Sequence, residues 1–140
     1  MRYLLDTNIF VYLASDLDLL SRDVHALLSD YDSVLYMSAE SEKELIVAFR
    51  NKKLLSKRWK NESEMIHAIE DEFYIQILPV KKEHMETYAK MEINEAQGHK
   101  DPSDHVIIAQ AITEQIPLIS SDTRFPFYEK QGLKLIRNQK

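Results

Sequence analysis

Four acidic residues stand where predicted strands end or predicted helices begin, and carboxylates in such positions can do chemistry. Asp6 directly follows the apolar run Tyr3-Leu4-Leu5. Asp122 follows another short apolar run, and Asp104 opens the most apolar helical segment of the chain. Glu44 lies within two turns of the start of a further helical segment. Because ligands of open α/β sheets bind beyond the carboxyl ends of the strands, these four side chains are candidates for one shared site.

Carboxylates that gather at one edge of a sheet repel one another, and each raises the pKa of its neighbours. Lys100 and Arg124 are near in sequence, but we expect both at the rim of the site rather than against the acids. A divalent cation would then supply the missing positive charge. Ligation by oxygen alone favours Mg²⁺ or Mn²⁺ over zinc, and Mg²⁺ held by carboxylates keeps several water ligands. The pattern therefore predicts metal-assisted attack of water on phosphorus.

Each acid also has a purely structural explanation. Asp6 could cap the helix that follows it, and Asp122 could form an Asx-turn with the residues after it. Asp101 could be the N-cap of a helix with Pro102 at its first position, and Asp104 would then be an anion in the first turn that the helix dipole favours. Glu44 follows a serine by three residues, which is the spacing of a capping box. The hypothesis of a shared site rests on all four acids reaching the same edge of one sheet.

The elements that would position these acids alternate between strand and helix. Short apolar runs predict strands at residues 3–5, 34–37, 74–78, 117–120 and 133–136. Amphipathic patterns predict helices that start near residues 9, 21, 39 and 62, and helices over 83–93 and 103–114. The first run has no polar alternation and is expected at the centre of the sheet, while the segment 103–114 is expected to be the deepest helix. This alternation predicts an α/β fold with a parallel sheet and helices on both faces.

Composition narrows the class of protein. The chain has 140 residues, which predicts a single domain over residues 1–140, and it contains no cysteine, so disulfides and thiolate metal sites are excluded. No apolar run is long enough to span a bilayer and no signal-peptide pattern is present, so we expect a cytoplasmic protein. The net charge of −5 argues against a protein that binds nucleic acid through bulk electrostatics.

Basic residues are nevertheless concentrated in one segment, which we call the basic arm. Its members, with Trp59 among them, are Arg50, Lys52, Lys53, Lys57, Arg58 and Lys60. Such an arm on an acidic body could grip phosphates or dock an acidic partner peptide. A solvated helix end and loop is an equally good interpretation.

Four segments resemble the motifs of PIN-domain ribonucleases, in particular the toxin nucleases of bacterial VapBC-type toxin–antitoxin pairs. They are Leu5-Asp6-Thr7-Asn8; Ser38-x-x-Ser41-x-x-Glu44-Leu45; His99-Lys100-Asp101-Pro102-Ser103-Asp104, which runs into Ile108-Ala109-Gln110-Ala111; and Leu118-Ile119-Ser120-Ser121-Asp122-x-x-Phe125. The segments occur in the order of the family and bracket most of the chain. The resemblance implies a three-layer α/β/α sandwich around a mostly parallel sheet of about five strands. It also implies metal-dependent cleavage of single-stranded or structured RNA.

Matched position by position, the acidic quartet of the family falls on Asp6, Glu44, Asp104 and Asp122. Asn8 and Ser120 match positions that help to hold these acids. The resemblance implies that Asp6 is the principal metal ligand and that Asp104 and Asp122 complete one or two Mg²⁺ or Mn²⁺ sites. Glu44 would hold the attacking water or a second metal, and hydrolysis would leave a 3′-hydroxyl and a 5′-phosphate. A small antitoxin protein and a homodimer are the partners implied.

The sequence departs from the family pattern at a few positions. Ser103 and His105 stand where many relatives of this subgroup have Phe and Arg, and Ser120 replaces a common Thr. Periodicity does not select Glu44 over the acids at positions 40 and 42, so that assignment rests on the resemblance. His99 and His105 flank the expected site, but an isolated histidine is more often a surface or packing residue, and neither is assigned as a general base.

Three other functions remain open at this point. A phosphotransferase or phosphatase of the haloacid-dehalogenase type would use Asp6 as nucleophile, but that chemistry needs a second acid two residues on, where this chain has Asn8. An RNA-processing PIN nuclease that is not a toxin would carry the same acids. A catalytically silent module of the same fold would bind a partner through the basic arm and the first helices.

Overall fold

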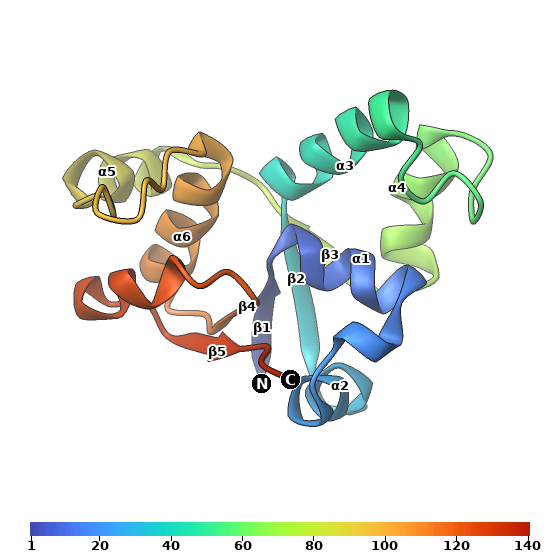
Figure 1. The fold of residues 1–140 in the computed structure, drawn as a ribbon, viewed down its shortest axis with the longest axis horizontal. Helices are drawn as coiled ribbons and strands as arrows, with labels where there is room; N and C mark the ends of the chain where they lie inside the picture. Colours follow the sequence, from blue (N-terminus) through green and yellow to red (C-terminus); the bar gives the residue numbers. More distant parts are fainter.

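The computed structural model describes residues 1–140 and contains a five-stranded, entirely parallel sheet with helices packed on both faces (Figure 1). The strands, in the spatial order β3-β2-β1-β4-β5, are β1 (Arg2–Leu5), β2 (Val34–Ser38), β3 (Ile75–Leu78), β4 (Leu118–Ser120) and β5 (Leu135–Arg137). The α-helices are α1 (Thr7–Ser15), α2 (Arg22–Ser29), α3 (Ala39–Lys52), α4 (Glu62–Asp71), α5 (Lys82–Lys90) and α6 (Pro102–Glu114), and the 3₁₀ helices are η1 (Leu17–Leu19) and η2 (Phe125–Gln131). The predicted α/β/α architecture is confirmed.

β1 is the central strand, as its apolar sequence without polar alternation predicts. It pairs with β2 on one side and with β4 on the other. Because successive side chains of a strand point to opposite faces, Tyr3 and Leu5 enter one hydrophobic core and Leu4 enters the other. The first core is closed by α1 to α4, and the second by α6 and η2 (Figure 1).

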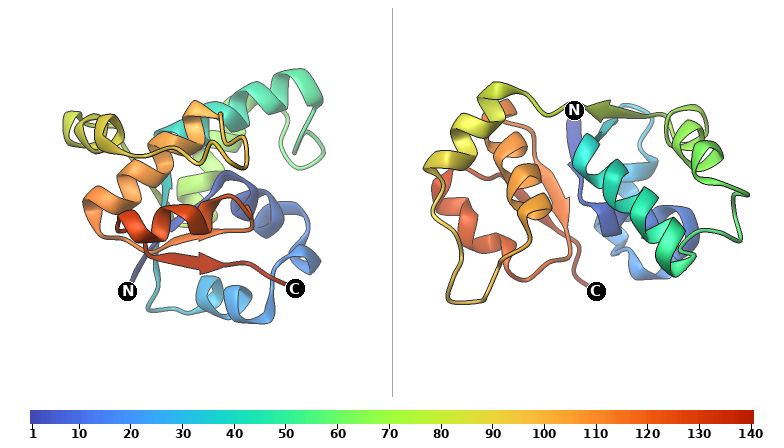
Figure 2. Two further views of the ribbon diagram at one scale, coloured as in Figure 1. Left: turned by 60° about the vertical axis from the view of Figure 1, so that its left-hand side comes forward. Right: turned by 90° about the horizontal axis from the view of Figure 1, so that it is seen from above.

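α6 is the most deeply buried helix. Its side chains are buried without interruption from Ser103 to Ala111, which confirms the prediction drawn from its apolar sequence. Asp101 caps it by accepting a hydrogen bond from the Ser103 N–H (2.9 Å), and Pro102 occupies its first turn. The two views of Figure 2 show α6 and α3 approaching each other, and the Ser103 hydroxyl lies 3.4 Å from a carboxylate oxygen of Glu40 in α3. The start of α6 is therefore fixed beside the first turns of α3.

The helix predicted over residues 83–93 ends earlier in the structure than its sequence pattern indicates. α5 ends at Lys90, because Met91 is extended and the following loop is held against η2. In that loop the Asn94 N–H donates to the Tyr128 hydroxyl (3.1 Å), and the Asn94 amide donates to the Arg124 carbonyl (3.0 Å). Neither 3₁₀ helix is predicted from the sequence, and β5 begins two residues later than expected.

The basic arm is partly structural. Arg58 donates to the carbonyl of Ala14 (3.0 Å), pairs with Glu72, and lies 5.1 Å from the ring centres of both Trp59 and Phe73. The exposed lysines of the arm, which make no ion pair, are Lys52, Lys53, Lys57 and Lys60. None of the helices in the whole chain is both long and apolar enough to cross a membrane.

Candidate active site

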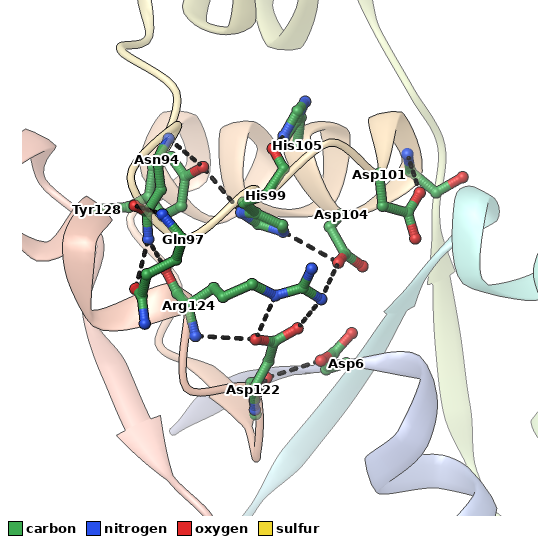
Figure 3. A network of polar contacts seen from close by, with 12 residues as sticks. Asp6, Asn94, Gln97, His99, Asp101, Asp104, His105, Asp122, Arg124 and Tyr128 are labelled. Carbon is green, nitrogen blue, oxygen red and sulfur yellow. Dashed lines mark hydrogen bonds and ion pairs between the residues drawn. The ribbon is translucent and has the colours of Figure 1, made fainter.

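The four acids converge where the carboxyl ends of β1 and β4 meet the first turns of α6 and α3. Asp6 follows β1 at once, and Asp122 comes two residues after β4. Asp104 lies in the first turn of α6, and Glu44 lies in the second turn of α3. In Figure 3 the guanidinium of Arg124 lies against the carboxylates of Asp104 and Asp122, and the carboxylate of Asp6 lies close to Asp122. All of these positions lie at one edge of the sheet, where ligands of parallel α/β folds bind.

Asp6 is almost fully buried, and both of its carboxylate oxygens accept hydrogen bonds. Oδ1 accepts from the Thr7 N–H (2.9 Å), and Oδ2 accepts from the Ser120 hydroxyl (2.7 Å). The pKa of Asp6 is raised to about 7, mainly by burial; the Ser120 hydrogen bond opposes this rise, and the charges of Asp104 and Asp122 add to it. Asp6 is therefore both a helix cap and an acid that holds its charge poorly at neutral pH.

Asp104 has the same property for a related reason. Burial is the largest cause that raises its pKa to about 7, followed by the charges of Asp101, Glu44 and Asp122, while Arg124 lowers it. Oxygens of Asp104, Asp101 and Glu44 all lie within 4.8 Å of one another. Asp101, which the sequence indicates only as a helix cap, is thus an additional acid of this site, and its place directly before Pro102 gave no sign of that.

Glu44 is fixed by the first turn of α1. The Thr7 hydroxyl lies 2.7 Å from Glu44 Oε1 and 2.8 Å from the Ser41 hydroxyl, so it can donate to the first and accept from the second. Burial raises the pKa of Glu44, the Thr7 hydrogen bond lowers it, and the charges of Asp101 and Asp6 raise it. Because Ser38 is the N-cap of α3, the capping-box explanation of Glu44 is wrong.

The other two acids of α3 face different neighbours. Glu40 pairs with Lys43 (3.0 Å) and lies near Ser103. Glu42 lies toward Glu70 of α4, whose charge raises the pKa of Glu42 in addition to the larger effect of burial. Of the three candidates, only Glu44 shares close oxygen contacts with Asp101 and Asp104.

Arg124 is not at the rim, and that expectation is wrong. Its Nε and Nη2 atoms form two hydrogen bonds with Asp122 Oδ1 (3.0 Å) and Oδ2 (2.7 Å), and Nη2 lies 3.8 Å from Asp104 Oδ2. Burial alone would raise the pKa of Asp122, but the hydrogen bonds and charge of Arg124 lower it overall. The Arg124 N–H also donates to Asp122 Oδ1 (2.8 Å), which is the expected Asx-turn. This short turn brings the guanidinium back onto the acids, whereas Lys100 is exposed.

His99 also has a contact that the sequence did not reveal. Its ring is completely buried, with Nε2 3.0 Å from Asp104 Oδ2 and Nδ1 2.8 Å from the Tyr128 hydroxyl. His99 and His105 are both buried, as expected of packing residues. The sequence did not predict the hydrogen bond between His99 and Asp104. His105 bonds instead to Tyr88 and to the backbone carbonyl of His99.

The two supporting residues differ in what they touch. Ser120 lies between two acids, donating to Asp6 and accepting from the Asp122 N–H (3.0 Å). Asn8 is exposed and makes no hydrogen bond to any of the acids. The residue of this turn that holds an acid is Thr7.

The donor set fits a divalent cation that prefers oxygen. Glu44, Asp101 and Asp104 could offer three carboxylate oxygens within 4.8 Å of one another, and oxygens of Asp104 and Asp122 lie within the same distance of each other beside His99. Asp6 is outside these groups but interacts with Asp104 and Asp122 through charge. Burial, together with the charges of neighbouring acids, raises the pKa of Asp6 and of Asp104 to about 7, and Arg124 is the single guanidinium beside them, so the protein itself does little to stabilise their ionised forms. A divalent cation would supply the positive charge that favours the ionised forms.

Comparisons with known proteins agree with this geometry. The family profile of the PIN domain matches residues 3–131. A search of curated protein sequences gives no match.

Solved structures match over the whole fold. A chain of VapBC2 from Rickettsia felis, bound to a DNA fragment from its promoter, is 18% identical with a TM-score of 0.73, covering 99% of this chain and 100% of that one. A chain of VapBC-1 from nontypeable Haemophilus influenzae is 22% identical with a TM-score of 0.69, covering 100% of both chains. A chain of VapBC-5 from Mycobacterium tuberculosis, of the VapBC family of toxin–antitoxin systems, is 20% identical with a TM-score of 0.63, covering 97% of this chain and 98% of that one. At these identities the likeness is one of fold.

Proposed function

The chain belongs to the PIN domain family, and on that premise we propose that residues 1–140 form a single Mg²⁺- or Mn²⁺-dependent endoribonuclease domain, the toxin of a toxin–antitoxin pair. The observation that carries this proposal is the convergence of Asp6, Glu44, Asp104 and Asp122 at the carboxyl edge of the sheet. The raised pKa of Asp6 and of Asp104, about 7 for each, supports a site that is completed by a cation. Such a site suits the hydrolysis of RNA phosphodiester bonds.

When bound, the cation would stabilise negative charge on the phosphate and make an attacking water more acidic. Asp6 and Asp104 are the buried ligands of this proposal, and Asp122 is the third acid facing them. Glu44 has one oxygen fixed by Thr7 (2.7 Å), which leaves the other oxygen to orient water. Because the pKa of Glu44 is raised, it is better suited to accept a proton from that water near neutral pH than an exposed glutamate would be.

Arg124 is the cation of the site that faces the substrate. Its side chain is 35% exposed, so solvent reaches it although it pairs with Asp122. With Nε and Nη2 bonded to Asp122, the remaining N–H groups of the guanidinium can donate to phosphate oxygens. We assign to Arg124 the role of holding the phosphate at the edge of the acids.

The partner that we propose is a small antitoxin protein. VapBC-5, whose fold this chain shares, belongs to the VapBC family of toxin–antitoxin systems. A groove of about 490 Å³ lies between α1 and α3 beside Glu44, with Val11, Val47 and Leu54 supplying apolar lining and Lys52 a positive charge. A peptide segment of the antitoxin with apolar and acidic side chains would suit this groove. A homodimer and a cytoplasmic location complete the proposal.

Cleavage of labelled RNA by the purified protein tests the nuclease activity. We expect cleavage with Mn²⁺ or Mg²⁺, none after chelation, and a loss of at least about 100-fold in Asp6→Asn, which keeps the size of the side chain but removes a charge that the cation needs. Asp32→Asn, at an exposed acid before β2 at the other end of the sheet, is the matched control and should cleave like the unaltered protein. The products should carry a 5′-phosphate.

Several results would contradict this proposal. Cleavage in the presence of a chelator, equal cleavage by Asp6→Asn, or products ending in a 2′,3′-cyclic phosphate would exclude the mechanism. Release of phosphate from small phosphoesters, without cleavage of RNA, would favour a phosphatase instead. A folded protein that binds a partner but cleaves nothing would be the catalytically silent module.

Controlled expression in bacterial cells tests the role as a toxin. We expect expression of the unaltered protein to arrest growth, Asp6→Asn to leave growth unchanged, and co-expression of a small reading frame adjacent to the gene to restore growth. Normal growth, combined with accurate cleavage of a cellular RNA precursor, would instead identify an RNA-processing nuclease.

A further inference from the structure

His99 and Tyr128 form a buried hydrogen-bonded chain that ends on Asp104 and has no role in the mechanism above. Neither side chain is exposed to solvent. The Asn94 N–H donates to the Tyr128 hydroxyl (3.1 Å), the hydroxyl lies 2.8 Å from His99 Nδ1, and His99 Nε2 lies 3.0 Å from Asp104 Oδ2 (Figure 3). The chain therefore connects the loop after α5, η2 and the first turn of α6.

The hydrogen atoms of this chain can be assigned from its two ends. The Asn94 N–H can only donate, so it occupies a lone pair of the Tyr128 oxygen and leaves the hydroxyl proton for His99 Nδ1. A histidine ring whose Nδ1 accepts a hydrogen bond carries a single N–H. With Nδ1 accepting, that N–H is on Nε2, and it donates to Asp104 Oδ2.

The imidazole ring is also fixed by packing. It lies 5.4 Å from the Phe125 ring and 4.9 Å from the His105 ring, measured between ring centres. The backbone carbonyl of His99 accepts from His105 Nε2 (2.8 Å), and His105 Nδ1 lies 2.9 Å from the Tyr88 hydroxyl. With ring and backbone both held, the N–H of His99 has one direction available to it.

We propose that His99, oriented by Tyr128, is a positioning residue that holds one oxygen of Asp104 and thereby turns the other toward Glu44 and Asp101. In Figure 3 one oxygen of Asp104 points to His99 and the other points away from it. A carboxylate free to rotate would present both oxygens in varying directions, whereas this one presents a single oxygen to a cation. This proposal rests on the proposed nuclease function, because that function requires the cation that this oxygen of Asp104 would bind.

Two measurements test this role. One is calorimetric titration of the metal-free protein with Mn²⁺ in the absence of RNA, and the other is RNA cleavage. In His99→Asn the amide can still meet Tyr128 but cannot reach Asp104, and we expect Mn²⁺ affinity to fall by about 10- to 100-fold, the usual effect of losing a partner that orients a ligand. In His99→Gln the longer side chain can place an N–H near the position of Nε2 and should restore most of the affinity. Tyr128→Phe should also weaken Mn²⁺ binding, but by less than His99→Asn does, since the ring of His99 keeps its packing.

Tyr74→Phe is the control, because it removes the hydroxyl of an exposed tyrosine directly before β3, at the end of the sheet opposite to the acids. It should bind Mn²⁺ with unchanged affinity, and thermal unfolding of each metal-free variant establishes that it is folded. Unchanged affinity in folded His99→Asn, or equal weakening in the Asn and Gln variants, would overturn the positioning role. An unaltered protein that neither binds Mn²⁺ nor cleaves RNA would overturn the proposed function itself, so the two failures are distinct.

Discussion

Asp6 and Asp122 each serve the backbone and the site at the same time. A carboxylate has two oxygens and can accept about four hydrogen bonds. Asp6 caps α1 with Oδ1 and meets Ser120 with Oδ2, while Asp122 closes an Asx-turn and also pairs with Arg124. The structural and functional explanations of these acids are therefore compatible, and the local bonds are what direct the carboxylates toward one another.

Arg124 allows a prediction about charge. Its guanidinium lies 2.7 Å from Asp122 Oδ2 and occupies the side of the acids where positive charge is needed. We expect Arg124→Gln to bind Mn²⁺ several-fold more tightly, because the cation no longer competes with a fixed positive charge. Calorimetric titration measures the change.

The same substitution should lower the thermal unfolding midpoint of the metal-free protein at neutral pH, since the acids lose their counter-charge. Arg22→Gln, an exposed arginine at the start of α2, should change neither quantity. Weaker Mn²⁺ binding by Arg124→Gln would mean that the guanidinium orients Asp122 for the cation rather than competing with it.

Two irregular elements, the loop after α5 and the 3₁₀ helix η2, position more of the site than their sequences suggest. Asn94 joins them through its N–H to Tyr128 and through its amide to the Arg124 carbonyl. His99 lies in this loop and Arg124 directly precedes η2, so both residues that contact acids from this side depend on the same junction. The loop is therefore part of the support of the site.

The basic arm gives a prediction at the scale of the element. Arg58→Ala removes a hydrogen bond to the Ala14 carbonyl and the stacking on Trp59 and Phe73, so we expect the free energy of unfolding to fall by about 1–2 kcal/mol. The neighbouring exposed Lys57→Ala should change it by less than about 0.5 kcal/mol. Urea unfolding measures both.

Lys57→Ala also tests whether the exposed lysines of the arm bind RNA. If they do, this variant should bind RNA more weakly, and its RNA affinity should depend less on salt concentration. An Arg58→Ala protein as stable as the unaltered one would show that the arm does not contribute to the stability of the fold.

For the whole molecule, the raised pKa values of Asp6 and Asp104 make stability depend on pH. Each carboxyl has a pKa of about 7 in the folded chain against an ordinary value of 3.8, so the folded state binds these protons more tightly than the unfolded state. Stability from these two groups is therefore complete below about pH 4 and is lost as the pH rises toward about 7. We expect the unfolding midpoint of the metal-free protein to fall between about pH 5 and pH 8 for this reason.

Mn²⁺ should reverse that loss. Because the cation binds the ionised carboxylates, it should raise the unfolding midpoint at about pH 8 much more than at about pH 5. Asp104→Asn should flatten the pH dependence of the metal-free protein and reduce the effect of Mn²⁺. A midpoint that rises steadily from pH 5 to 8 without metal would contradict the raised pKa values.

Much of the fold was predictable from the sequence, because it is decided by burial along single elements. The apolar run at residues 3–5 predicted the central strand, and the continuous apolar segment after Pro102 predicted the deepest helix. The alternation of strands and helices predicted the parallel sheet, and the four motifs predicted the family. Periodicity reports which side of an element is buried, and that was sufficient to place Asp6, Asp104 and Asp122 at one edge of the sheet.

Tertiary structure alone decided which side chains meet there. It placed Glu44, which the resemblance had assigned, beside Asp104, added Asp101, brought Arg124 onto Asp122, and joined His99 to Asp104. These contacts depend on how the layers pack and on turns such as the one from Asp122 to Arg124. A pattern within one segment carries no information about a partner on another element, so the charge balance of the site could be read only once the layers were in place.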